Sequence, residues 1–198
     1  MIELRIQQQF IDSADLKYQS AEALSKPIAA ALQALLACVT SGGKVLACGN
    51  GGSAAQARHL VAQFVGRFER ARPELPAIAL DDGAVLSALA GEQDFAPVFA
   101  RQVRALGQAG DLLLVMSPGP DAANLLAAVE AAHEREMTVV ALTGRGSNRI
   151  GAALREMDVQ VNVPHERAAR VEEVHLLILH CLCDGVDTQL LGEQEVTT

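Results

Sequence analysis

The chain of 198 residues has the length of one domain, which is long enough for a full hydrophobic core and too short for two enzyme modules. Half of its residues are hydrophobic, but only 3% are aromatic and tryptophan is absent. The core must therefore consist of Ala, Leu, Val and Ile, which suit helices and parallel strands better than a β-sandwich. The 16 basic and 24 acidic residues give a net charge of −8, which argues against binding of nucleic acid or of an anionic membrane through bulk charge.

The sequence lacks the features of an exported or membrane-spanning protein. No apolar run reaches the roughly 18 residues of a membrane span, and residues 1–10 lack the apolar region of a signal peptide. The cysteines lie in apolar stretches without the paired spacing of a structural zinc site: Cys38, Cys48, Cys181 and Cys183. We therefore expect a cytoplasmic protein whose cysteines are buried and reduced.

The first 40 residues have helical rather than strand periodicity. Their apolar side chains recur at the spacing of one helix face: Ile28, Leu32, Leu35, Leu36 and Val39. Ser25, shortly before Pro27, is typical of a helix start. This pattern predicts an amino-terminal pair of helices, over about residues 2–20 and 26–40.

From Lys44 onward, short apolar runs alternate with amphipathic segments. Five runs have the length of strands: Val45–Cys48, Ala77–Leu80, Leu112–Met116, Thr138–Leu142 and Val159–Val163. Helical patterns lie between them, for example over Ala54–Phe68 and Ala122–Arg135. The alternation predicts a parallel sheet with helices on both faces, in a single α/β domain over residues 1–198 with its core in residues 41–198.

The last predicted helix, over about Ala168–Leu191, is apolar on nearly all of its faces. A helix on the surface of a monomer would carry one polar face. We therefore expect this helix to be buried in a subunit interface.

Three loops follow predicted strands, at the edge of a parallel sheet where ligands bind. In the loop Gly49–Ser53, glycines allow a close approach and helix N–H groups favour an anion such as phosphate, although the loop also suits a plain tight turn. It matches neither of the glycine motifs that bind nucleotides. The loop Ser117–Asp121 offers one hydroxyl, two prolines without N–H groups and a carboxylate, which favours a rigid turn over an anion site. The loop Thr143–Ser147 suits either a ligand or an ordinary turn.

Several histidines lie on predicted helices. His59 and Gln63 are four residues apart and share a helix face. The last helix carries four further polar candidates: Glu172, Glu173, His175 and His180. A lone helical histidine is more often packed or solvated than functional, and we interpret His133 and His165 in that way.

Several segments closely resemble the phosphoheptose isomerases, in the same order and over nearly the whole chain: Cys48–Ala55, His59, Val65–Phe68, Arg72–Leu80, Phe99–Gly107, Val140–Arg145 and Glu173–Asp184. The last of these segments also resembles the DnaA initiator-associating protein. The resemblance implies a sugar isomerase (SIS) domain of flavodoxin-like type, with a five-stranded parallel sheet and amino-terminal helices. It also implies a homotetramer with ligand sites between subunits.

Three parts of the implied site depart from the isomerase pattern. Gln63 stands where the isomerases carry a catalytic glutamate, and a carboxamide is not a useful base near neutral pH. The phosphate loop keeps only Ser117 of the family's four hydroxyls. The polar segment after the second strand is Asp81–Gly83 instead of Thr-Thr-Asp.

The resemblance also implies a metal site, with zinc as the candidate ion, formed by His59, Gln63, Glu172 and His180. Glutamate and glutamine have exchanged places, so the set of ligand types is unchanged. Glu172 and His180 are eight residues apart, about 12 Å along a helix, so we expect them to reach one ion only from different chains. The alternative is that His59 and His180 are hydrogen-bonded interface residues without a metal.

Two hypotheses follow. In the first, the departures have abolished catalysis, and the chain is a non-catalytic homotetrameric scaffold, like the DnaA initiator-associating protein, whose partner is DnaA or another protein. In the second, it is a phosphoheptose isomerase that converts sedoheptulose 7-phosphate to D-glycero-D-manno-heptose 7-phosphate. The phosphosugar would then bind the loop residues Asn50, Gly51, Gly52, Ser53 and Ser117. Glu172 and His180 would be catalytic.

Overall fold

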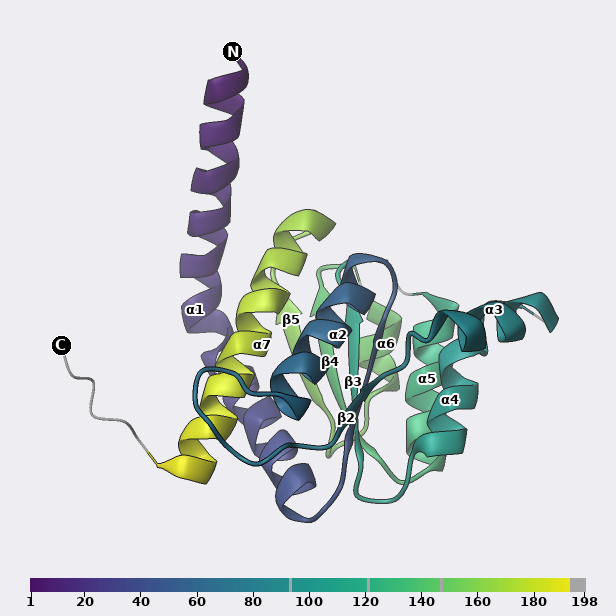
Figure 1. Cartoon of the computed structure of the whole chain (residues 1–198). Coiled ribbons are helices and arrows are strands. Elements are labelled where there is room, and N and C mark those ends of the chain that lie inside the picture. The colour runs from purple at the N-terminus through teal and green to yellow at the C-terminus, as the bar shows by residue number, and fades with distance from the viewer. Residues whose placement is uncertain (93, 121, 147, 193–198) are drawn as a thin grey trace.

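A computed structural model describes residues 1–92, 94–120, 122–146 and 148–192. Five parallel strands form one sheet in the order β2-β1-β3-β4-β5, which is the flavodoxin-like order (Figure 1). The strands are β1 (Val45–Gly49), β2 (Ala77–Ala79), β3 (Leu112–Ser117), β4 (Thr138–Gly144) and β5 (Val159–Val163). The predicted fold class is therefore confirmed, and each predicted strand is present within two residues of its expected ends.

Seven helices surround the sheet in the described part of the chain: α1 (Ile2–Thr40), α2 (Gly52–Val65), α3 (Gly83–Glu92), α4 (Val98–Leu106), α5 (Ala123–Glu134), α6 (Asn148–Ala153) and α7 (Ala168–Leu191). The bounds of α7 agree with the prediction. Two separate hydrophobic clusters form the core. One cluster joins α1, α2 and α7 to one face of the sheet, and the other joins α4, α5 and α6 to the opposite face.

The predicted pair of amino-terminal helices is wrong, because α1 is one continuous helix with Pro27 inside it. Buried side chains on both sides of the proline, Leu24 and Ala31 among them, hold the two halves against the same core, which offsets the hydrogen bond that proline removes. The Ser25 hydroxyl donates to the Glu22 carbonyl instead of capping a new helix.

The amino-terminal half of α1 extends away from the rest of the molecule (Figure 1). Several of its large apolar side chains are exposed: Ile2, Leu4, Ile6, Phe10 and Ile11. By length and mean hydropathy, α1 and α7 each contain an 18-residue window that would suit a membrane span. The apolar composition of α7 is explained by its place in the core, since Val171, Ile178 and Leu182 are buried within the chain.

All four cysteines are free thiols. Cys38, Cys48 and Cys183 are buried, as predicted, but Cys181 is exposed. Cys181 lines the groove between α1 and α7, where α7 turns an apolar face outward next to the exposed Leu177. The apolar surroundings of Cys181 in the sequence therefore did not indicate burial.

Candidate functional site

Strand β1 lies between β2 on one side and β3 on the other, so the strand order reverses at β1. The carboxyl ends of β1 and β3 therefore mark the switch point, which is where ligands bind in this class of fold. The predicted loop Gly49–Ser53 lies there and leads directly into α2. Gly51 has a φ of +56°, which favours glycine. The hydroxyl of Ser53, which is fully buried in the first turn of α2, has no hydrogen-bond partner among the described residues.

Asn50 is paired with a residue that the sequence did not single out. Its side-chain amide exchanges two hydrogen bonds with the side chain of Asn124, at the start of α5. Asn124 is 4% exposed. Its place in the first turn after the third strand was the only sequence signal that could have identified it.

Ser117 lies at the end of β3 and is 3% exposed, with its hydroxyl 3.4 Å from the carbonyl of Gly119. The neighbouring loop after β4 approaches it closely, because a side chain at Gly144 would come within 2.5 Å of the Pro118 carbonyl. Asp121, whose carboxylate favoured a rigid turn over an anion site, and Ser147 lie outside the described residues.

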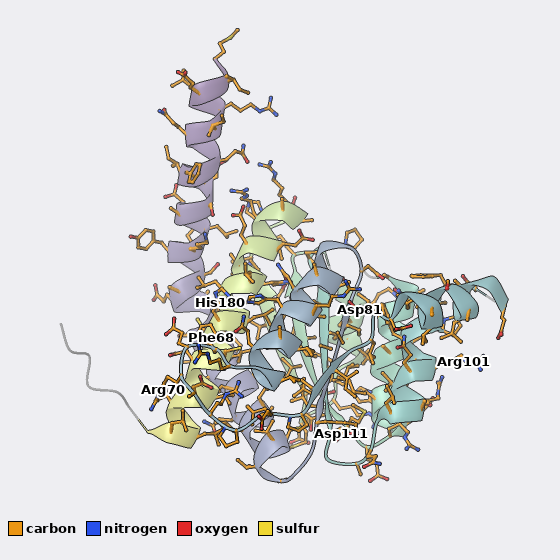
Figure 2. The ribbon with its side chains drawn as sticks, viewed as in Figure 1. Phe68, Arg70, Asp81, Arg101, Asp111 and His180 are labelled. Atoms are coloured by element: carbon orange, nitrogen blue, oxygen red, sulfur yellow. The ribbon has the colours of Figure 1, made fainter. Side chains whose placement is uncertain are left out.

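His59 of α2 and His180 of α7 meet within one chain. Their Nε2 atoms are 2.9 Å apart. Phe68 lies beside His180 (Figure 2). The centroids of these two rings are 5.6 Å apart. Burial, and secondly the neighbouring His180, lower the pKa of His59. Two neutral imidazoles at this distance share one proton or, when both present a lone pair, offer two nitrogen ligands to one ion.

Glu172 lies at the other end of the contact between α2 and α7. One oxygen of its carboxylate is 2.8 Å from the position that a side chain at Gly52 would occupy, so the carboxylate lies over the glycine loop. Gln56 donates to the Glu172 carbonyl at 2.7 Å. Within the described residues, no group of three or more His, Cys, Asp and Glu side chains could hold a metal ion. Within one chain, His59 therefore contacts His180, and Glu172 contacts the glycine loop. The carboxylate of Glu172 does not join the two histidines in one site.

Gln63 follows His59 by one turn and is half-buried. Its backbone carbonyl accepts a hydrogen bond of 2.6 Å from Arg72, a residue to which sequence analysis assigned no role. Arg72 also forms an ion pair of 2.6 Å with Asp187 of α7, and the two side chains are 1% and 3% exposed. Arg72 thus fastens the carboxyl end of α2 to α7, and nothing in the sequence signals a pair that is 115 residues apart.

The remaining polar candidates have structural partners. His175 is fully buried, and its Nε2 lies 3.2 Å from the carbonyl of Thr143. Burial lowers the pKa of His175 to about 4, so its ring is neutral at physiological pH. Glu173 pairs with Arg170 and accepts a hydrogen bond from Ser13 of α1.

His133 and His165 lie outside the loops after β1 and β3. His133 is buried and bonded to Asp158, at 2.7 Å, which agrees with its interpretation as a packed residue. His165 Nδ1 accepts from the backbone of Arg167, at 3.0 Å. In the segment after β2, Asp81 pairs with Arg58 of α2, and Asp82 accepts a bond from the backbone of Val85, at 2.9 Å.

Comparison with known proteins agrees with this fold. The sequence pattern of the SIS domain matches residues 9–144, and the chain belongs to the SIS domain family. A protein from Methylibium petroleiphilum named phosphoheptose isomerase is 61% identical over 198 residues, which cover all of this chain and 99% of the relative. The structure of the phosphoheptose isomerase GmhA from Neisseria gonorrhoeae is 43% identical, with a TM-score of 0.90, and covers 95% of this chain and 100% of that one.

A phosphoheptose isomerase structure from Francisella tularensis is 39% identical, with a TM-score of 0.88, and covers 95% of this chain and 99% of that one. The resemblance inferred from the sequence motifs is thus confirmed. The first hypothesis, a non-catalytic scaffold like the DnaA initiator-associating protein, is wrong, because relatives of up to 61% identity over the full chain are named phosphoheptose isomerase. Three local substitutions in the site do not outweigh an identity that extends over the whole chain.

Proposed function

We propose that this chain is a cytoplasmic phosphoheptose isomerase that interconverts sedoheptulose 7-phosphate and D-glycero-D-manno-heptose 7-phosphate. The observation that carries the proposal is the 61% identity to a protein of that name over all of this chain and 99% of the relative. The glycine loop after β1 supports it, since Gly51 leaves open space for a phosphosugar to approach the backbone and the buried Ser53 hydroxyl lacks a hydrogen-bond partner among the described residues. Asn50, Gly51, Gly52, Ser53 and Ser117 are the proposed binding residues.

An aldose–ketose isomerisation moves one proton between adjacent carbons and another between their oxygens. The carbon-bound proton needs a base, which the carboxamide of Gln63 cannot supply. We assign that role to Glu172, whose carboxylate lies over the glycine loop. His180, supported by His59 at 2.9 Å, is the proposed group that moves the proton between the oxygens.

Assembly into a homotetramer completes this site in our proposal. Eight residues of α7 separate Glu172 from His180, about 12 Å along the axis, which is too far for both to act on adjacent carbons in one chain. A second copy can bring its own Glu172 near the His59–His180 pair. The exposed apolar side chains in the first half of α1 offer the surface for that contact, and α7 begins at the end of that surface, where Arg170 donates to the Gln9 carbonyl.

Zinc is the proposed metal, and the residues present fit half of a tetrahedral site. His59 and His180 supply two imidazole nitrogens 2.9 Å apart, and Gln63 and a carboxylate from another copy are the remaining candidates. A bound zinc ion would occupy the lone pairs of both nitrogens, so it would take over the role of His180 by polarising the sugar carbonyl. Metal analysis of the wild type beside His59→Ala should show stoichiometric zinc that the substitution removes.

The test of the function is the conversion of sedoheptulose 7-phosphate by the purified protein. We expect turnover in the wild type and a loss of at least about 100-fold in kcat for Glu172→Gln, which removes the base. Glu173→Gln is the matched control, since it changes a neighbouring carboxylate that bonds to Arg170 and Ser13, and we expect it to keep most of the activity. Absence of turnover in a folded, zinc-supplemented wild type would refute the proposed function.

A further inference from the structure

A reciprocal pair of side-chain amides lies across the switch point of the sheet. Asn50 follows β1 directly, Asn124 lies in the first turn of α5 after β3, and the two strands are neighbours. The Asn50 amide nitrogen donates to the Asn124 oxygen at 3.0 Å, and the Asn124 nitrogen donates to the Asn50 oxygen at 2.8 Å. This contact joins residues 74 positions apart and ties together the loops at which α2 and α5 begin.

The two asparagines differ in exposure, and this difference separates their roles. Asn124 is 4% exposed, whereas Asn50, directly after β1, is exposed to solvent. A carboxamide has two N–H donors and two oxygen lone pairs, and the reciprocal pair uses one of each on both residues. Asn50 therefore keeps one donor and one acceptor for a ligand, while burial keeps Asn124 away from one.

The pair also determines which way the Asn50 amide faces. Turning one amide alone would bring N–H against N–H and oxygen against oxygen, and would leave the buried polar atoms of Asn124 without partners. Asn124 thus selects one orientation of Asn50. A free Asn50 side chain would have to lose rotamer freedom each time a ligand bound.

We propose that Asn124 is a positioning residue for phosphosugar binding, acting through the orientation of the Asn50 carboxamide. This inference rests on the function proposed above and adds a residue to its binding site. Because Asn124 does not itself reach the ligand, its whole effect on affinity depends on Asn50. Replacing Asn124 by alanine should therefore raise KM and leave kcat unchanged, because the groups that move protons lie on α2 and α7.

A double-mutant cycle tests this dependence. Calorimetry with sedoheptulose 7-phosphate gives Kd, and turnover gives KM and kcat, for the wild type, Asn124→Ala, Asn50→Ala and the double variant. We expect Asn124→Ala to raise Kd about tenfold, which is near the upper end of the range for one lost hydrogen bond, with kcat within about twofold. In the Asn50→Ala background the same change should raise Kd less than about twofold. An unchanged Kd, or an equal tenfold rise in both backgrounds, would overturn the proposal.

Two further variants guard against a general loss of structure. Asn124→Leu keeps the branched shape of the buried side chain without its polar atoms and should raise Kd as Asn124→Ala does. His133→Ala removes a hydrogen bond at the opposite end of α5, to Asp158, and should lower the melting temperature without changing Kd. If His133→Ala weakens binding as much as Asn124→Ala, the role assigned to Asn124 is wrong. A wild type that binds the sugar without converting it would contradict the proposed function alone, and the Kd values would still decide the role of Asn124.

Discussion

His175 links the stability of this fold to pH. Its pKa is about 4 in the folded chain because burial disfavours the charged ring, whereas an unfolded histidine titrates near 6.5. Between these values the unfolded chain binds a proton that the folded chain does not, so stability falls as the pH falls from about 6.5 to 4. The difference amounts to about 3 kcal/mol by pH 4.

We therefore predict that His175→Gln makes the unfolding free energy less dependent on pH across that window. Glutamine retains an N–H donor for the Thr143 carbonyl and does not titrate. Urea denaturation at several pH values measures the effect. An equally steep fall in the variant would assign the acid sensitivity to other groups, among them His59, whose pKa is also lowered.

Arg72 and Asp187 form a buried ion pair whose loss should be costly. Arg72→Met leaves the Asp187 carboxylate buried without its partner, and we expect it to lower the unfolding free energy by about 3–5 kcal/mol. The double variant Arg72→Met with Asp187→Leu should recover much of that loss. As a matched control, Arg104→Met breaks the exposed pair with Glu134 and should have little effect on urea denaturation. A small effect of Arg72→Met would mean that water reaches Asp187.

Helix α1 contains an internal proline, Pro27, and stays continuous because the residues around it pack on the core. Pro27→Ala restores a backbone N–H and removes the ring from the helix interior, so we predict a gain of about 1–3 kcal/mol in unfolding free energy. As a control, Lys26→Ala at the adjacent position replaces one good helix former by another and should leave the unfolding free energy unchanged. Thermal unfolding compares the variants, and a destabilised Pro27→Ala would show that the local shape of the helix is needed for packing.

Assembly determines whether the proposed site is complete. Light scattering should give a mass about four times that of the chain, because the exposed apolar side chains of α1 need a partner. The double change Ile6→Asp with Phe10→Asp should dissociate the tetramer and abolish turnover together. Met157, which is 79% exposed outside α1 and α7, provides a control, since Met157→Asp should remain tetrameric and active. A stable wild-type monomer at micromolar concentration would contradict both the assembly and the shared site.

The periodicity of the sequence was sufficient for the strands, for α7 and for the glycine loop, because these features depend on local alternation of apolar residues and on turn residues. It also indicated that the loops after β1 and β3 lie at one edge, since the carboxyl ends of parallel strands meet there. It failed at Pro27, where a local helix-breaking signal was weaker than the apolar contacts of Leu24 and Ala31 with the core.

Only the tertiary structure decided which distant side chains meet. His59 and His180 are 121 residues apart, Arg72 and Asp187 are 115 apart, and Asn50 and Asn124 are 74 apart. These contacts depend on the positions at which α2, α5 and α7 pack on the sheet, and helix packing follows from the shape of whole faces instead of from local spacing. The same packing places the Glu172 carboxylate over the glycine loop. Counting residues along α7 predicts the distance from Glu172 to His180, but it cannot predict that Glu172 contacts this loop.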